Sequence, residues 1–152
     1  MNWRLIGVLA LVVGLGKGAV SLFGVKSAVV GWAILLGAGL TCAIVLVLKA
    51  PARYFLHGFW TGFFSQVIET LLAAVFAGTY MTNNPDFATL VSQFPMSVNP
   101  RALLVVLAPL AGGFNGLLLG VFTWVVSKIL GPDKPAATPA PPAEPPTVPP
   151  SV

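Results

Sequence analysis

Hydrophobic residues along the chain fall into four long runs that are separated by short polar links. The runs cover residues 5–24, 27–48, 59–80 and 102–130. A helix needs about 20 mostly apolar residues to cross the hydrocarbon core of a membrane. The pattern therefore predicts an all-α integral membrane protein, a bundle of four transmembrane helices within residues 1–131.

The longest link, residues 81–101, contains signals of its own. Asn84 and Pro85 form a helix start, because asparagine is a favoured N-cap and proline fits the first helical position. Apolar residues then recur at helical spacing, namely Phe87, Leu90, Val91 and Phe94. This spacing predicts a short amphipathic helix at the membrane surface. Asn99 and Pro100 repeat the start signal just before the fourth run.

The composition changes abruptly after the fourth run. Residues 132–152 contain nine prolines and no hydrophobic residue larger than valine. Such a segment is typical of a disordered tail with partial polyproline-II character. We interpret it as a solvated end in preference to a docking site for a proline-recognition domain.

Composition sets the environment that the chain requires. Hydrophobic residues make up 57% of the 152 positions and charged residues only 8%, against about 25% charged residues in an ordinary soluble domain. A soluble chain this short has too much surface to hide that many apolar groups. The expected partner is therefore the lipid bilayer. The net charge is +4, and most of the charged residues lie near the ends of the runs. This pattern argues against nucleic-acid binding, which needs basic residues clustered on one face.

Basic residues in the links predict the orientation of the chain. One side collects Arg4, Lys49, Arg53, Lys128 and Lys134, and the other collects Lys26, Arg101 and Lys17. Cytoplasmic flanks are enriched in Lys and Arg, so both termini are predicted to be cytoplasmic. The first run lacks a clear cleavage pattern, and we interpret it as an uncleaved helix.

The overall layout resembles that of small four-span membrane proteins common in bacteria. This resemblance implies a multi-pass protein of the cell membrane, and specifically of a bacterial inner membrane. It rests on layout alone and assigns no role to any residue.

Two polar residues, Gln66 and Glu69, interrupt the third run. On a helical wheel, mostly small or polar residues share the arc around Glu69, namely Gly58, Gly62, Ser65, Gln66, Ala73, Phe76 and Tyr80. Bulky residues fall on the far arc, namely Trp60, Phe64, Val67, Leu71 and Val75. Because small faces allow close helix packing in a bilayer, the Glu69 face is predicted to point into the bundle.

The fourth run shows the same division more sharply. Gly112, Gly116 and Gly120 recur at every fourth position, and Asn115 lies on the same arc. We predict that these glycines form a helix-packing face. Pro109, which lacks a backbone N–H, is predicted to kink this helix.

Similar stripes are weaker in the first two runs. Lys17 shares a stripe with small residues of the first run, namely Ala10, Gly14 and Ser21. Thr41 shares an arc with Gly37 and Ala38 in the second run. The most economical arrangement turns all four of these faces inward.

This arrangement predicts an intramembrane polar cluster of Glu69, Gln66, Asn115 and Lys17. Glu69 is either protonated and hydrogen-bonded to Asn115 or Gln66, or ionised and paired with Lys17. Burial raises the pKa of a carboxylic acid, whereas a nearby cation lowers it. The sequence leaves both states open.

No catalytic constellation is visible in the sequence. The one histidine, His57, has no cysteine or carboxylate close by, and the one cysteine, Cys42, lies in an apolar run. Metal-ligand spacings, a phosphate loop and a nucleophile elbow are absent. We expect no enzyme activity, no cofactor and no metal site.

Two functional interpretations therefore remain. The first is a structural or accessory membrane subunit, in which Glu69 is a polar pin and the helices pack within the protein, in a homo-oligomer or against a membrane-protein partner. The second is a minimal transporter or proton-linked channel built around Glu69, because intramembrane acids often mark ion pathways. We favour the first, since one acid is a thin basis for a transport route.

Overall fold

The computed structural model describes residues 1–24, 28–50, 52–94 and 99–131. Every regular element in these ranges is a helix: α1 Trp3–Phe23, α2 Ala28–Lys49, α3 Tyr54–Val75, α4 Ala77–Asn83, α5 Pro85–Ser92 and α6 Pro100–Leu130. Four of them, α1, α2, α3 and α6, are long and apolar enough to cross a membrane. The prediction of an all-helical chain with four long apolar helices is confirmed, and these helices suggest a membrane location. The predicted tail lies outside the described residues.

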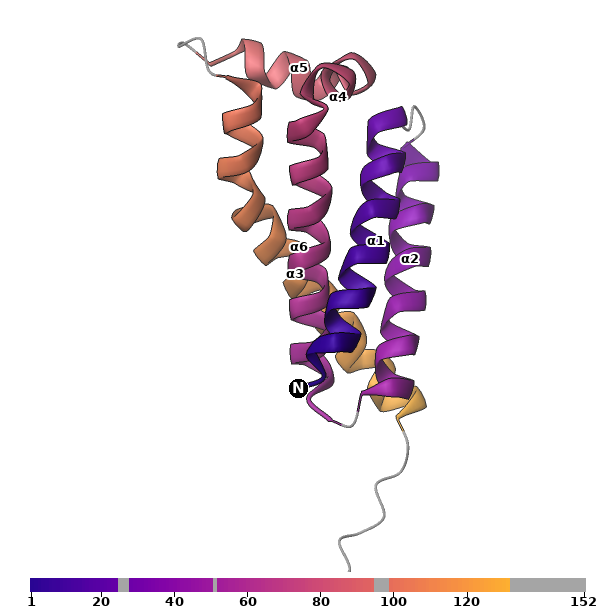
Figure 1. Cartoon of the computed structure of the whole chain (residues 1–152). Helices are drawn as coiled ribbons and strands as arrows, with labels where there is room; N and C mark the ends of the chain where they lie inside the picture. The colour runs from indigo at the N-terminus through magenta and orange to yellow at the C-terminus, as the bar shows by residue number, and fades with distance from the viewer. Residues whose placement is uncertain (25–27, 51, 95–98, 132–152) are drawn as a thin grey trace, which may run out of the picture.

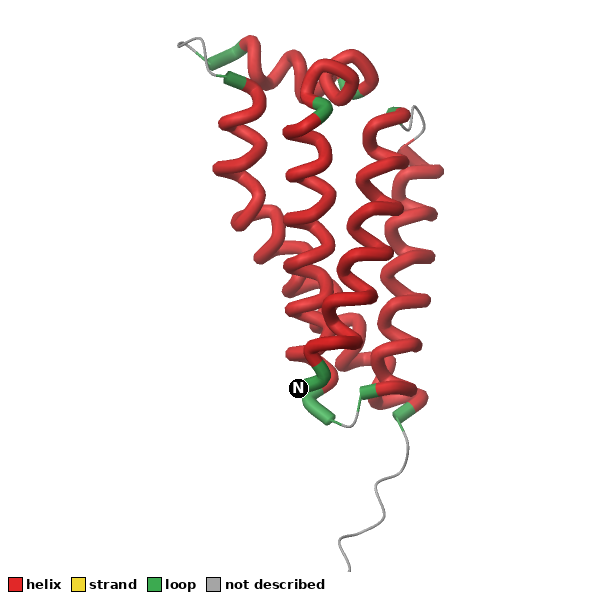
Figure 2. The backbone as a smooth tube through the Cα atoms, in the orientation of Figure 1, coloured by secondary structure: helices red, strands yellow, loops and turns green. Residues whose placement is uncertain are grey.

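The four long helices stand side by side, and α4 and α5 lie across one end of them (Figures 1 and 2). Helices α1 and α3 run in the same direction, whereas α2 and α6 run in the opposite direction (Figure 1). Helix α3 has the most extensive contacts, with α6 on one side and α1 on the other, and α2 packs mainly against α6. The position of α3 explains why its polar residues reach two different neighbours.

The third long helix is displaced from the predicted range of 59–80. It begins at Tyr54, directly after a left-handed Arg53 with φ 56°, and its last residue is Val75. At Phe76 the backbone leaves helical geometry, with φ −102° and ψ 38°, and the chain continues as α4. The link between the second and third predicted runs was too long, because the aromatic residues after Arg53 already belong to α3.

Asparagine side chains hold α4 across the end of α1. The Asn83 amide donates to Leu22 O at 2.7 Å, and the Asn84 amide donates to Ser21 O at 3.0 Å. Backbone carbonyls at the end of a helix lack intrahelical partners. These two bonds give such carbonyls of α1 side-chain donors and join the end of α4 to the end of α1.

The predicted short helix after Asn84 is confirmed as α5, with Pro85 in its first turn. Asn84 does not cap it through its side chain, whose amide nitrogen donates instead to Ser21 O of α1 and to Tyr80 O. The second start signal works as predicted, since Asn99 Oδ1 accepts a hydrogen bond from Arg101 N at 3.0 Å. Similar dipeptides therefore play different roles at the two positions.

Helix α6 is the longest element, with 31 residues and Pro109 inside it. A straight helix of this length extends about 46 Å, which exceeds the hydrocarbon core of about 30 Å. Figure 1 shows that α6 crosses α3 obliquely and changes direction along its length. The oblique course brings the second half of α6 against both α3 and α2.

Candidate functional site

The contact between α3 and α6 is made by backbone against backbone. A Cβ added at Gly62 would lie 2.8 Å from Asn115 O and 2.9 Å from Gly116 Cα. A Cβ added at Gly116 would lie 2.7 Å from Phe59 O. All three distances are shorter than ordinary Cβ contacts, so a side chain at either position would force the two helices to shift. The predicted face of α6 is therefore the face that touches α3.

Aromatic rings from α3 cover the three glycines of α6. Phe63, Phe59 and Phe55 each approach one glycine, in the order Gly112, Gly116 and Gly120. Successive rings of this series stack with their centroids 6.3 Å apart. The side of α6 that carries bulky residues is exposed, as predicted, at Leu110, Phe114, Leu117, Val121, Trp124 and Val125.

A second close contact joins α1 to α3. Added Cβ atoms at Gly14 and Gly18 would lie 2.7 Å from Ser65 O and from Leu72 Cδ2, respectively. Buried residues recur at every fourth position of α1, namely Ile6, Ala10, Gly14 and Gly18. Gly18 was not among the predicted contact residues, although its spacing from Gly14 follows the same rule.

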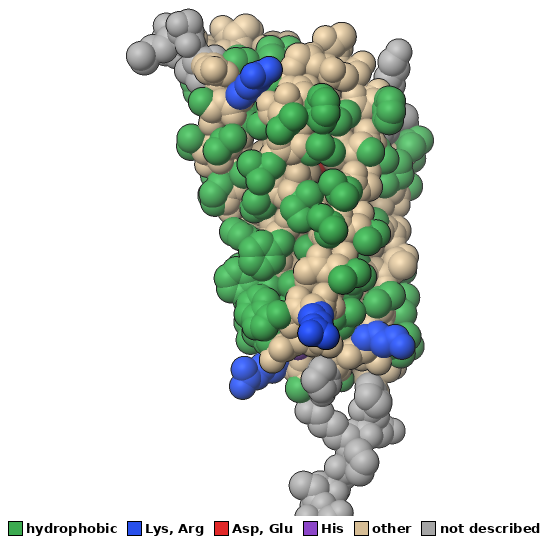
Figure 3. All heavy atoms as spheres, in the orientation of Figure 1, with side chains coloured by type: hydrophobic (Ala, Val, Ile, Leu, Met, Phe, Trp, Pro, Cys, Tyr) green, Lys and Arg blue, Asp and Glu red, His purple; other side chains and the backbone are tan. Residues whose placement is uncertain are grey.

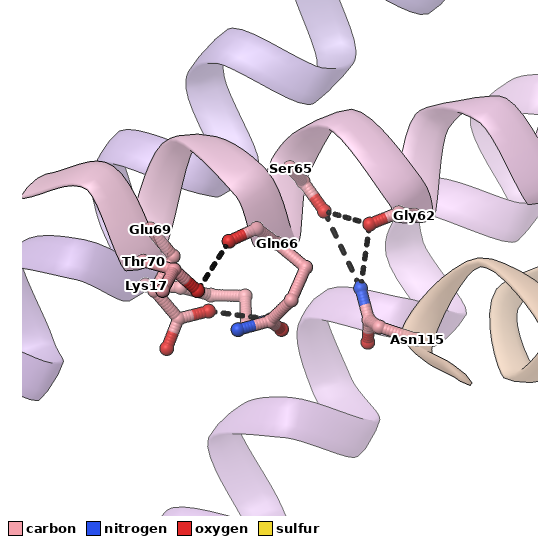
Figure 4. A network of polar contacts seen from close by, with 7 residues as sticks. All are labelled: Lys17, Gly62, Ser65, Gln66, Glu69, Thr70 and Asn115. Atoms are coloured by element: carbon pink, nitrogen blue, oxygen red, sulfur yellow. Dashed lines mark hydrogen bonds and ion pairs between the residues drawn. The ribbon is translucent and has the colours of Figure 1, made fainter. Parts of the chain in front are cut away.

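This close approach places Lys17 beside the polar residues of α3. Its Nζ lies 2.8 Å from Glu69 Oε2 and donates to Gln66 Oε1, also at 2.8 Å (Figure 4). The two charged side chains are 13% and 17% exposed. In the described part of the chain, Glu69 Oε2 has no hydrogen-bond donor apart from this ammonium. Of the two predicted pairings of Glu69, the structure has the one with Lys17.

Asn115 belongs to a separate polar contact. Its Nδ2 donates to Gly62 O at 2.8 Å and lies 3.5 Å from Ser65 Oγ, which itself donates to Gly62 O at 3.0 Å (Figure 4). Gly62 and Glu69 are about two helical turns apart, roughly 10 Å along α3. Asn115 therefore joins α6 to α3, while Lys17 joins α1 to α3 at a different level. The sequence had allowed Asn115 as a partner of Glu69, and that contact is not made.

Helix α2 does not use the predicted small face. Thr41 is exposed, and its hydroxyl donates to Gly37 O in its own helix at 2.9 Å. The buried residues of α2 are instead Cys42, Ala43, Leu46 and Val47, which cluster with Leu119 and Val126 of α6. The prediction was wrong because α2 packs through its C-terminal half, where ordinary apolar side chains fill the contact.

The middle of α2 stands away from the other long helices and leaves a partly open crevice of about 340 Å³. Its lining comes from all four long helices and includes Leu36, Gly39, Phe114, Leu118, Lys17 and Asn115. Most of the lining is apolar, and the polar exceptions are Lys17, Ser65 and Asn115. The crevice thus borders both polar contacts.

His57 precedes the third predicted run, but it lies in the first turn of α3 and is only 1% exposed. Its Nε2 accepts a hydrogen bond from Asn2 N at 3.0 Å, and its Nδ1 lies 3.1 Å from Arg53 O. Because Nε2 accepts, Nδ1 carries the proton and donates to the carbonyl. This neutral histidine fastens the start of α1 to α3. The aromatic setting in the sequence gave no sign of this contact.

No metal site is evident in the part of the chain that the structure describes, where no three His, Cys, Asp or Glu side chains come together. Cys42 is buried and unpaired as a thiol. The polar side chains of the α1–α3 and α3–α6 contacts join helices to one another, and these contacts do not pair a nucleophile with a general base. The chain matches no protein-family model, no curated protein and no solved structure.

Proposed function

We propose that this protein is a four-helix integral membrane protein with a structural or accessory role. It acts by helix packing, within itself and against a partner membrane protein or further copies of itself. The observation that carries the proposal is the pairing of Glu69 with Lys17 at 2.8 Å. The acid that marked a possible ion pathway is neutralised by a residue of the neighbouring helix.

The remaining polar groups support the same interpretation. Gln66 accepts from Lys17, and Asn115 bonds to the backbone of α3. Each of these contacts joins two different helices at one fixed level. Interhelical hydrogen bonds and small residues are the usual means of specifying helix packing in a bilayer. A chain of titratable groups, as expected of a proton route, is not present among the described residues.

For its location we propose a bacterial inner membrane with both termini in the cytoplasm. Arg4, Lys49, Arg53 and Lys128 belong to the helix ends on the side of the N-terminus, and Arg101 to the opposite side. On the face drawn in Figure 3, basic side chains gather at one end, another lies near the opposite end, and hydrophobic side chains are spread between them. Reporter fusions after Lys134 and near Ser92 test the topology, and both reporters on the same side would contradict it.

The function is tested by purification in mild detergent followed by identification of bound proteins. We expect a stable complex, either with another membrane protein or between copies of this chain, and no ion flux when the purified protein is placed in liposomes. A monomer without partners that conducts protons or cations would overturn the proposal.

The second candidate function is the minimal transporter or proton-linked channel. It is favoured by the partial exposure of Lys17 and by its position on the lining of the crevice. The Glu69→Gln variant separates the two candidates, because glutamine keeps hydrogen-bonding capacity and removes the titratable proton. A folded variant that has lost the flux of the wild type would establish transport, whereas the structural role predicts no flux from either protein and a less stable variant, since Lys17 loses its counter-charge.

A further inference from the structure

The crevice between α2 and the other long helices lies at the depth where a membrane is most apolar. Leu36 and Gly39 are near the middle of α2, and Phe114 and Leu118 are near the middle of α6. If the long helices cross a bilayer, the crevice therefore sits close to the bilayer midplane. Its volume of about 340 Å³ falls within the range of ligand pockets, which is roughly 300–1,000 Å³.

The charge of the lining restricts what can enter. Among the described residues that line the crevice, Lys17 is the one that carries a charge, and Glu69 balances this charge at 2.8 Å. A charged headgroup would find no opposite charge there, and an unpaired charge is very costly in an apolar environment. The occupant that complements this lining is uncharged.

The polar edge of the crevice can still hold one oxygen atom of a ligand. An ammonium group has three N–H donors, and Lys17 directs two of them to Glu69 and Gln66. The third N–H group is left to donate to an acceptor atom of a ligand in the crevice that Lys17 lines. An ester carbonyl or a hydroxyl group on a hydrocarbon chain supplies such an acceptor without adding charge.

We propose that this crevice binds an uncharged membrane lipid, with its hydrocarbon chain against Phe114 and Leu118 and one oxygen at Lys17. A phospholipid can place an acyl chain against this lining, but its charged headgroup stays at the membrane surface, about 15 Å from the midplane of a core about 30 Å thick, so it does not bring an oxygen to Lys17. This inference rests on the proposed membrane location but not on the structural role. The reporter fusions test that location independently.

Photocrosslinking in phosphatidylcholine nanodiscs tests the proposal. The probe is a diacylglycerol that carries a diazirine on one chain, and the reference is a phosphatidylcholine with the same labelled chain. We expect the diacylglycerol to label peptides containing Leu36 or Leu118 more strongly than the phosphatidylcholine at equal mole fraction. Equal labelling by both lipids, or labelling by neither, would overturn the proposal.

A pair of variants on α2 makes the test specific. A Cβ added at Gly39 or at Gly37 meets no atom within 4 Å, and only Gly39 lines the crevice. Gly39→Leu fills the crevice, and we expect labelling to fall at least about tenfold, the lower end of what one misfitting apolar group does to a hydrophobic pocket. Gly37→Leu should leave labelling unchanged. Undiminished labelling of Gly39→Leu contradicts the assignment.

A second pair of variants keeps the test valid if Gly39→Leu fails to fold. Leu36 lines the crevice and is 50% exposed, whereas Leu40 is 46% exposed and does not line it. Leu36→Trp adds bulk within the crevice and should lower labelling, whereas Leu40→Trp should not. The same labelling in both tryptophan variants refutes the site.

Discussion

Replacing Gly116 by alanine adds one methyl group where two helix backbones touch. The new Cβ would lie 2.7 Å from Phe59 O and 3.2 Å from Phe63 N. Both are backbone atoms of α3, so relief requires the helices to move apart and not merely a side chain to rotate. Separation of α6 from α3 would also stretch the bond from Asn115 to Gly62 O, now 2.8 Å long.

The size of the effect follows from two opposing contributions. Alanine favours the helix over glycine by up to about 1 kcal/mol, and an extra methyl in a tight contact costs about 1–3 kcal/mol. Gly113 provides a matched control on the same helix, because an added Cβ there meets nothing within 4 Å. We expect Gly116→Ala to be less stable than Gly113→Ala by about 1–3 kcal/mol.

The assay is unfolding of both variants in detergent micelles by titration with a denaturing detergent, followed by circular dichroism. The comparison of the two variants cancels the helix propensity of alanine. If both variants unfold at the same detergent fraction, the backbone contact between α3 and α6 is not as close as described. We also expect Gly116→Leu to destabilise the protein more than Leu117→Ala on the exposed arc does. Equal tolerance of these two changes would lead to the same conclusion.

Substitutions at three further positions probe the remaining contacts by the same unfolding assay. Asn115→Leu should destabilise the protein by about 0.5–1.5 kcal/mol, the net contribution of one hydrogen bond, because Gly62 O loses its interhelical donor but keeps Ser65 Oγ; unchanged stability would argue against this bond. His57→Leu should also lower stability by about 1–3 kcal/mol, since Asn2 N loses its acceptor, and His57→Gln should recover part of the loss if that acceptor matters. Thr41→Val should change stability by less than about 0.5 kcal/mol, and a larger loss would return Thr41 to the packed interior.

The sequence predicted the face of α6 well because that face carries redundant information. Three glycines in register, with bulky residues opposite, leave only one orientation that permits close contact. The same holds for α3, where Gly58, Gly62 and Ser65 are buried and Phe64 and Leu71 are exposed. Thr61 is 0% exposed but was not predicted to be buried. A threonine close to the bulky arc of the helical wheel does not indicate whether it faces the other helices or the lipid.

The sequence was misleading where a helix packs without small residues. The contact of α2 uses Leu46 and Val47, and such residues are equally at home against lipid. Hydrophobicity does not distinguish a lipid-facing leucine from a buried one inside a membrane, so the choice depended on Thr41. That residue satisfies its hydroxyl within its own helix, which removes its need for a buried partner.

The candidate site was predictable in its members but not in its pairing. Lys17, Asn115 and Glu69 all lie on faces that were predicted to point into the bundle. Which of the two residues contacts Glu69 depends on how far each helix is shifted along its axis. This shift is set by the contacts of Gly14 and Gly116 with α3. Helix offsets of this kind arise from tertiary packing, and no single helix encodes them.

The pairing of Lys17 with Glu69 is the central claim, and a double-mutant cycle in detergent tests it most directly. Lys17→Met and Glu69→Leu should each lower the free energy of unfolding by about 3–5 kcal/mol, because each leaves one charge buried without its partner. The double variant should be much closer to the wild type, since paired replacement by apolar residues of similar size is often neutral or stabilising. A coupling energy of several kcal/mol is thus predicted. Losses that simply add in the double variant would show that Lys17 and Glu69 do not interact, and would remove the basis for a structural pin between α1 and α3.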